Sequence, residues 1–213
     1  MGSSESPLRR SYDRIAAHYA DRFADELAHK PFDRHFLDRL AADISVRGWT
    51  IDLGSGPSQI GAYLALGGLR VLSVDLSRAM LHEARALRPD AVCLQADMRA
   101  LPWASQSIAA IVAFYSLIHI PQADLAGTLR EIRRVLSPGG RFALTVHIGT
   151  ETVHRDEMLG EAVDIDFFFF DPDRQARELE EAGFVIQHRE ERDPYPGGVE
   201  AETRRAYIVA GPE

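Results

Sequence analysis

The chain has 213 residues and a formal net charge of −8, and 46% of its residues are hydrophobic. That length is enough for one α/β domain with a full core, and the acidic balance argues against nucleic acid as the main partner, because phosphate binding needs a basic face. No apolar run approaches the roughly 18 residues that span a membrane, and the polar stretch from Met1 to Arg10 does not have the pattern of a signal peptide. The single cysteine, Cys93, lies in an apolar segment; we expect it to be a buried packing residue in a reducing, cytoplasmic environment.

Two helices are expected before the first strand. From residue 8 to residue 28, apolar side chains recur at helical spacing, and Tyr12 and Tyr19, seven positions apart, share one face of this helix. Pro31 begins a second helix, whose apolar face includes Phe36 and Leu40. The first helix either packs against a core or closes over a ligand.

Strands and helices alternate from residue 49 to residue 147. The expected strands are 49–53, 70–74, 91–95, 108–114 and 141–147, and the expected helices are 58–66, 78–88 and 122–136. Such alternation predicts a parallel sheet that is covered by helices on both faces. Ligands of these sheets bind beyond the carboxyl ends of the strands.

A glycine-containing turn follows the first expected strand. Gly54 and Gly56 allow a tight turn and close approach of a ligand, and Asp52 directly precedes this turn. A dinucleotide fingerprint would have a third glycine at position 59, where this chain has Gln59. Asp52 would repel a pyrophosphate but attract a cation. S-adenosylmethionine, which carries a sulfonium and an ammonium group and no phosphate, therefore fits this loop better than NAD does.

Carboxylates also end the next two expected strands. Asp75 lies 19 positions after Gly56, where an acidic residue can accept hydrogen bonds from both ribose hydroxyls. Asp97 ends the third strand and could accept a hydrogen bond from an adenine amino group. We expect all these carboxylates to lie beside one crevice.

The fourth strand leads into the same crevice through Phe114 and Tyr115. His119 lies four residues after Tyr115 and is a candidate general base for a substrate hydroxyl, amine or carbon acid; the alternative is that it only shapes the pocket. His147, at the end of the fifth strand, is a weaker candidate on the same argument.

Residues 148 to 171 interrupt the alternation, and we expect an irregular insert there. Its four consecutive phenylalanines, Phe167 to Phe170, either line an apolar pocket or divide between the core and a dimer contact. The neighbouring carboxylates form no convincing metal-binding pattern, so no metal is predicted. A helix at 172–182 and strands at 184–189 and 205–210 complete the chain.

These motifs resemble those of class I S-adenosylmethionine-dependent methyltransferases, in the broad group of the ubiquinone and menaquinone methyltransferases. The segments that carry the resemblance are 51–56 (first motif), 74–81 (second strand), 96–102 (adenine segment), 111–121 (fourth strand and its loop) and 129–145 (helix and fifth strand). One departure is Ser58, where the family often has a third glycine.

The resemblance implies a Rossmann-like α/β fold. Its seven-stranded, mostly parallel sheet would end in an antiparallel hairpin and have helices on both faces and an N-terminal helical lid. It implies a single domain made of a lid (1–45), a cofactor-binding core (46–147), and a substrate insert with closing strands (148–213). The residues expected to bind S-adenosylmethionine are Tyr12, Tyr19, Asp52, Gly54, Gly56, Asp75, Leu76, Met80, Asp97, Met98, Phe114 and Tyr115.

The predicted function is methyl transfer from S-adenosylmethionine to a small, partly apolar metabolite, with the acceptor an oxygen, nitrogen or carbon atom. Transfer from a sulfonium requires alignment and exclusion of water more than a conspicuous catalytic constellation. The alternatives are a dinucleotide-dependent oxidoreductase and a non-catalytic cofactor-binding protein on the same fold. The expected partner is the small methyl acceptor, without nucleic acid or membrane, and the chain is expected to be a monomer or a homodimer.

Overall fold

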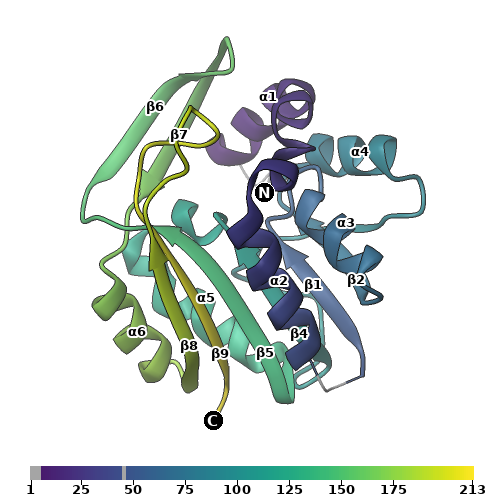
Figure 1. Cartoon of the computed structure of the whole chain (residues 1–213), viewed down its shortest axis with the longest axis vertical. Coiled ribbons are helices and arrows are strands. Elements are labelled where there is room, and N and C mark those ends of the chain that lie inside the picture. Colours follow the sequence, from purple (N-terminus) through teal and green to yellow (C-terminus); the bar gives the residue numbers. More distant parts are fainter. Residues whose placement is uncertain (1–5, 45–46) are drawn as a thin grey trace, which may run out of the picture.

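A computed structural model describes residues 6–44 and 47–213, and it contains one central sheet with helices packed on both faces (Figure 1). Before the sheet come α1 (Pro7–Phe23), the short 3₁₀ helix η1 (Glu26–His29) and α2 (Pro31–Asp43). The strands are β1 (Trp49–Leu53), β2 (Arg70–Asp75), β3 (Val92–Gln95), β4 (Ile108–Phe114), β5 (Leu136–His147), β6 (Thr152–Met158), β7 (Glu161–Phe168), β8 (Phe184–Arg192) and β9 (Arg205–Pro212). The remaining helices are α3 (Gln59–Leu66), α4 (Arg78–Leu87), the 3₁₀ helix η2 (Leu117–His119), α5 (Gln122–Val135) and α6 (Pro172–Glu181).

The main sheet has seven strands in the order β3-β2-β1-β4-β5-β9-β8. The pairs from β3 to β5 are parallel, whereas β9 is antiparallel to both β5 and β8. This confirms the predicted seven-stranded, mostly parallel sheet with its antiparallel closing strands. The antiparallel direction of β9 places its first residue, Arg205, at the edge where the parallel strands end.

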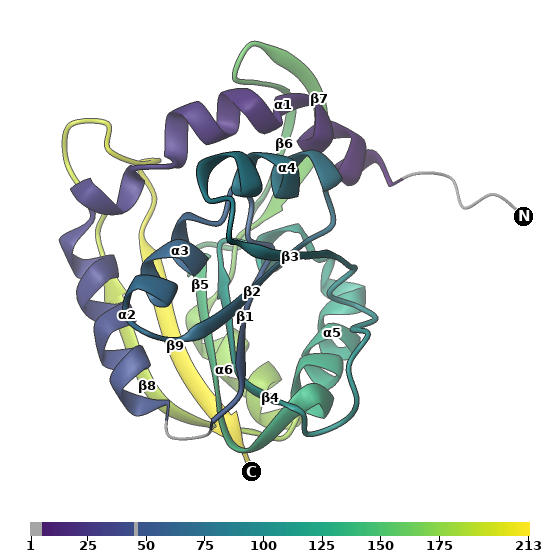
Figure 2. The ribbon, with the colours of Figure 1, turned by 90° about the vertical axis from the view of Figure 1, so that its right-hand side faces the viewer.

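Two apolar layers hold the helices on the sheet. On one face, Phe36 and Leu37 of α2 and Leu64 of α3 are buried against β2, β4 and β9. Leu129 of α5 and Leu179 of α6 are buried against the opposite face of the same strands. Figure 2 shows α2 and α3 on one side of the sheet and α5 and α6 on the other.

The expected lid of residues 1–45 is two separate structures. Only α1 lies over the carboxyl ends of the strands, where it packs against α4 and β7 (Figure 2). The helix α2 instead packs on one face of the main sheet, because its apolar side is complementary to that face. The expected boundary at 45/46 lies outside the described residues.

The insert after β5 is more regular than expected. Its strands β6 and β7 form a separate antiparallel hairpin that extends over the carboxyl ends of the main sheet (Figure 1). The expectation of an irregular segment was wrong, because β6 is mostly exposed and polar and so lacks the alternation that marks a half-buried strand.

The edge strand β3 also differs from expectation. Cys93 is only partly buried, and its neighbours Val92 and Leu94 have 47% and 37% of their surface exposed. The prediction of a buried cysteine was wrong, because β3 is the last strand of the sheet and no helix covers it fully.

Candidate active site

A cavity of about 530 Å³ lies at the carboxyl ends of the parallel strands. Its floor is formed by the ends of β1, β2, β4 and β5, and α1 and β7 cover it. The cavity brings together all twelve residues that the sequence assigned to cofactor binding, as well as His119. The individual side chains, however, make contacts that the sequence did not predict.

The turn after β1 has the conformation that its glycines were expected to allow. Gly54 and Gly56 have φ of +71° and +53°, and a Cβ atom on Gly54 would lie 2.3 Å from Cβ of Ser116. A side chain at Gly54 is therefore excluded on both conformational and steric grounds. Ser58 is also left-handed, with φ of +65°, and its hydroxyl lies 2.5 Å from that of Ser73 in the buried layer below the turn. Ser58 thus adopts the conformation for which glycine is favoured.

Asp52 is buried, and it serves the turn itself. Its Oδ2 accepts a hydrogen bond of 2.8 Å from the amide of Gly61 in the first turn of α3. Burial, partly offset by this bond and reinforced by the charge of Asp75, raises the pKa of Asp52 to about 7. The carboxylate therefore anchors α3, and its attraction for a cationic ligand acts from beneath the turn.

Asp75 occupies the tip of β2 and holds two loops together. Its Oδ2 accepts from the amide of Gly56 and its Oδ1 accepts from the amide of Ser77, both at 2.8 Å. Burial raises the pKa of Asp75 to about 6, against the effect of these two bonds. Each carboxylate oxygen keeps a second lone pair, which is the acceptor capacity that a pair of ribose hydroxyls requires.

Asp97 also lines the cavity, but Arg99 contacts its carboxylate. The Arg99 guanidinium donates from Nη2 at 2.7 Å and from Nε at 3.0 Å, and the Arg99 amide adds a third hydrogen bond. Burial raises the pKa of Asp97, but the hydrogen bonds and charge of Arg99 outweigh it, and the pKa is lowered overall. Leu76, Met80 and Met98 supply apolar surface beside these carboxylates.

Three consecutive residues of α1 fasten this helix over the cavity. The Ser11 hydroxyl accepts from the amide of Asp164 in β7 at 2.8 Å, and the Asp13 carboxylate accepts from the Ser77 hydroxyl at 2.6 Å. Between them, Tyr12 points into the cavity and packs edge-to-face on Tyr19, with ring centroids 6.2 Å apart. The helix α1 is thus bound to both α4 and the β6–β7 hairpin.

His119 joins the two covering elements. Its Nδ1 lies 3.0 Å from the backbone carbonyl of Asp166 in β7, and its Nε2 lies 2.7 Å from the hydroxyl of Tyr12 in α1. A carbonyl only accepts, so Nδ1 donates to it and Nε2 accepts from Tyr12. Burial lowers the pKa of His119 to about 4, which keeps the ring neutral. In this arrangement the lone pair that a general base would use is occupied by Tyr12.

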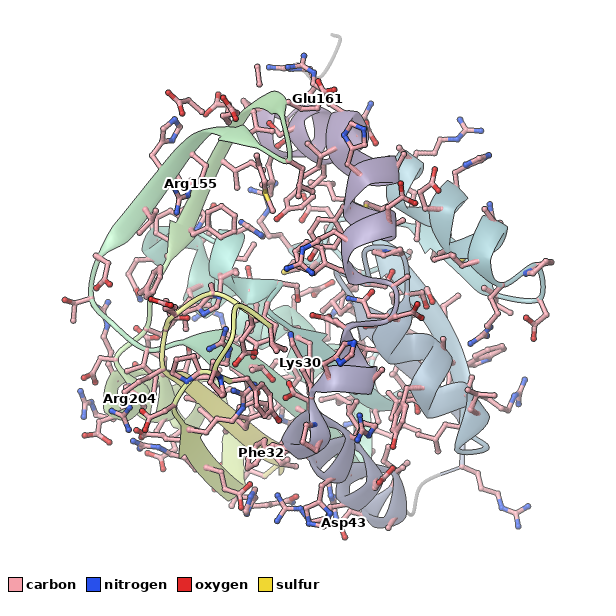
Figure 3. All side chains as sticks on the ribbon, turned by 45° about the horizontal axis from the view of Figure 1, so that its top comes forward. Lys30, Phe32, Asp43, Arg155, Glu161 and Arg204 are labelled. Carbon is pink, nitrogen blue, oxygen red and sulfur yellow. The ribbon has the colours of Figure 1, made fainter. Side chains whose placement is uncertain are left out.

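A buried ion network lies beside the cavity, and the sequence analysis did not find it. Glu200 is 3.2 Å from Arg205 and 3.6 Å from Lys30, and it pairs with Arg192 at 2.5 Å. Arg192 also contacts Asp33 at 3.0 Å. Lys30 lies between α2 and the β8–β9 loop in Figure 3, and with Glu200 and Arg205 it lines the cavity.

The aromatic residues that follow β4 and β5 form one wall. Phe114 belongs to the buried layer under α2, where its ring is 5.9 Å from that of Phe36. Tyr115 has the left-handed φ of +52°, an uncommon conformation for a bulky side chain and one that recurs at functional sites. Its ring stacks on the ring of His147, with centroids 5.0 Å apart.

The run of four phenylalanines divides among three roles. Phe167 and Phe168 line the cavity, Phe169 stacks on His147, and Phe170 is buried in the core. The pocket interpretation therefore applies to Phe167 and Phe168.

Within residues 6–44 and 47–213, no group of three or more histidine, cysteine, aspartate or glutamate side chains could hold a metal ion. No helix formed by these residues is long and apolar enough to cross a membrane.

Comparisons with known proteins agree with this fold. The methyltransferase domain family matches residues 51–144. The malonyl-[acyl-carrier protein] O-methyltransferase of Enterobacter lignolyticus is 32% identical over 63% of this chain and 51% of its own length. The ubiquinone/menaquinone biosynthesis C-methyltransferase of Rubrivivax gelatinosus is 32% identical over 65% of this chain and 55% of its own length. The chain thus spans about half the length of these curated relatives.

Solved structures show the same fold over the whole chain. The structure of DhpI with S-adenosylhomocysteine has a TM-score of 0.71 and 22% identity and covers 97% of both chains. The PH0226 protein of Pyrococcus horikoshii has a TM-score of 0.71 and 19% identity and covers 100% of both chains. At such identities the likeness concerns the fold. The family match over residues 51–144, the strand order and the glycine turn beside Asp75 together support one identification, a class I S-adenosylmethionine-dependent methyltransferase domain.

Proposed function

We propose that this protein transfers a methyl group from S-adenosylmethionine to a small, partly apolar acceptor. The observation that carries the proposal is the hydrogen bond from the Gly56 amide to Asp75. In a dinucleotide-binding turn, the corresponding amides face a pyrophosphate. Here that amide is directed at a carboxylate, which leaves an anionic turn suited to a nucleoside with a positively charged substituent.

The residues of the cavity fit S-adenosylmethionine. Asp75 has free lone pairs for the ribose hydroxyls, and Leu76 and Met98 offer apolar surface for adenine. Tyr12 and Tyr19 cover the side where the methionine end would lie. When bound, the cofactor supplies a methyl group on a positively charged sulfur, and the role of these residues is to hold it in position and exclude water.

The acceptor would occupy the other half of the cavity. Phe167, Phe168 and Tyr115 give it apolar walls, and Lys30 and Glu200 give it a charged end. The enclosed volume suits a small molecule. The relatives and solved structures are named as O-, C- and N-methyltransferases, so the acceptor atom is left open in the proposal.

The proposal extends to organisation and location. We infer a single catalytic domain in which α1 and the β6–β7 hairpin cover the site, acting in the cytoplasm as a monomer or homodimer with the methyl acceptor as partner. The single cysteine and the acidic net charge support this view.

Isothermal titration calorimetry tests the proposal against its alternatives. S-adenosylhomocysteine should bind and NAD should not, because the Gly56 amide, which would face a pyrophosphate, donates to the Asp75 carboxylate instead. Asp75→Ala should weaken S-adenosylhomocysteine binding by about 1.5–3 kcal/mol, the loss expected for hydrogen bonds to a charged group. Tighter binding of NAD would favour the oxidoreductase. Cofactor binding without methyl transfer to any acceptor would favour the non-catalytic alternative.

A further inference from the structure

Two histidines, His119 and His147, lie at carboxyl ends of the parallel strands and line the cavity. They differ in which ring nitrogen is available. Both nitrogens of His119 are engaged, by the Asp166 carbonyl and by the Tyr12 hydroxyl. His119 can therefore meet a ligand only if one of these contacts breaks.

His147 is held by one hydrogen bond and two stacked rings. Its Nδ1 lies 2.7 Å from the Thr203 hydroxyl, and its ring stacks on those of Tyr115 and Phe169 at centroid distances of 5.0 and 5.3 Å, each with an interplanar angle of 29°. Among residues 6–44 and 47–213, no hydrogen-bond partner of Nε2 is found. Because His147 lines the cavity and its Nδ1 is engaged by Thr203, Nε2 is the ring nitrogen that remains for a ligand there.

The hydrogen bond between Thr203 and Nδ1 of His147 allows Nε2 of the same ring to act as a base. A hydroxyl can both donate and accept, so it can accept from Nδ1–H and leave a lone pair on Nε2. When Nε2 takes up a proton, the same Nδ1–H···Oγ1 bond is kept and strengthened. This is the arrangement of an orienting group behind a base.

The charges around His147 come from several elements. Arg205 of β9, Glu200 of the β8–β9 loop, Lys30 before α2 and His119 all act on it. Burial, then Arg205, lowers the pKa of His147 to about 4, while Glu200 opposes this effect. The ring is therefore neutral near pH 7, in the form that can accept a proton.

Building on the proposed function, we propose that His147 is the catalytic residue on the acceptor side and that its Nε2 takes the proton of the methyl acceptor. The acceptor's lone pair forms the bond to the methyl carbon while the carbon–sulfur bond breaks and its electron pair stays on sulfur. The acceptor–hydrogen bond breaks, its electrons remain on the acceptor atom, and the proton passes to Nε2 of His147. Release of that proton to water restores the neutral ring.

A weak base suffices here because the total charge in the cavity is the same before and after the reaction. Before the reaction, the positive charge lies on the sulfonium; afterwards it lies on the imidazolium, while the thioether is neutral. Protonation of His147 is thus opposed in the substrate complex and relieved in the product complex. The pKa of His147 should therefore differ between the two complexes, whichever acceptor the protein uses.

The test is a histidine NMR titration of the complete protein bound to S-adenosylmethionine or to S-adenosylhomocysteine, from pH 8 to the acid limit of the folded complexes. The His147 resonances are assigned with His147→Gln. We expect the pKa of His147 to be about one to two pH units higher in the S-adenosylhomocysteine complex, the effect of a unit charge roughly 6 Å away at an effective dielectric constant of about 20–40. His154, exposed and paired with Asp166, serves as the internal control and should titrate alike in both complexes.

The possible results separate the two proposals. Equal titration of His147 in both complexes, or no titration with S-adenosylhomocysteine, would overturn the role of His147 and leave the proposed function standing. Failure of both ligands to bind would overturn the proposed function itself. In addition, His147→Gln should bind S-adenosylhomocysteine within about twofold of wild type, since Nε2 faces the acceptor; a larger loss would place His147 in the cofactor site instead.

Discussion

Replacing Asp75 by Asn should change how the stability of the ligand-free protein depends on pH. The pKa of Asp75 is raised by burial from 3.8 to about 6 in the folded protein. Between these values the folded state binds more protons than the unfolded state, so stability falls as pH rises through this window. The difference between 3.8 and about 6, at about 1.36 kcal/mol per pH unit, amounts to about 3 kcal/mol that the ionised carboxylate costs at pH 8.

The variant isolates this contribution because an amide does not titrate. Urea unfolding of wild type and Asp75→Asn should be compared at pH 8 and at pH 5. Wild type should regain about 1.4 kcal/mol relative to the variant at pH 5, where most Asp75 side chains are protonated in the folded state. The charge of Asp75 also raises the pKa of Asp52, so the coupled loss of that effect in the variant has the same sign.

Asp90→Asn is the matched control, because that carboxylate is 82% exposed on the surface. Its unfolding free energy should follow wild type at both pH values. If Asp75→Asn also follows wild type, the carboxylate is not ionising in a buried site, and the argument from its burial and its two amide donors fails.

Three other variants test the cover, the turn and the ion network. Tyr12→Phe leaves Nε2 of His119 without its donor and should lower stability by about 1–3 kcal/mol and speed amide exchange in α1, measured by hydrogen–deuterium exchange; unchanged exchange would contradict the fastening role. Gly54→Ala should abolish cooperative thermal unfolding or S-adenosylhomocysteine binding, because its Cβ has no room. Gly160→Ala, also left-handed but with nothing within 4 Å of its Cβ, should cost only about 1 kcal/mol, and equal effects would refute the steric argument. Arg192→Met removes the cation that Asp33 and Glu200 share and should lower the free energy of unfolding by about 3–5 kcal/mol in urea titrations, whereas a loss below 1 kcal/mol would show that the other partners of these carboxylates suffice.

Much of the fold follows from the sequence because its periodicity is strong. Buried parallel strands such as β4, in which every residue is buried, form continuous apolar runs that can be recognised directly in the sequence. The carboxyl ends of parallel strands lie at one edge, so Asp52, Asp75 and Asp97 were placed together correctly. Their hydrogen bonds could not be foreseen, because the Gly61 amide and the Arg99 guanidinium reach them only through the exact placement of α3 and the turn after β3.

The residues on the proposed acceptor side of the cavity were harder to predict for a physical reason. Lys30 is distant in sequence from Glu200 and Arg205, and a charged side chain read alone is expected to be solvated. Their burial depends on mutual pairing, which only the folded chain reveals. The reversed direction of β9 also brings the beginning of a strand, rather than its end, to the ligand edge. In the structure Arg205 pairs with His147 at the carboxyl end of β5, a register that is not visible in the sequence.

The β6–β7 hairpin begins and ends at almost the same point. Ile148 and Phe170 form a β-bridge, the Phe170 amide donates to the His147 carbonyl at 2.9 Å, and the Gly149 amide donates to the Phe170 carbonyl at 3.1 Å. The segment between these residues is therefore a loop whose two ends lie next to each other. Its length or sequence can change without redirecting β5 or α6, because the entropic cost of a longer loop grows only slowly. Under the proposed function, substrate choice and folding would then belong to separable parts of one chain, and an exchanged hairpin would carry a new acceptor preference onto an unaltered cofactor platform.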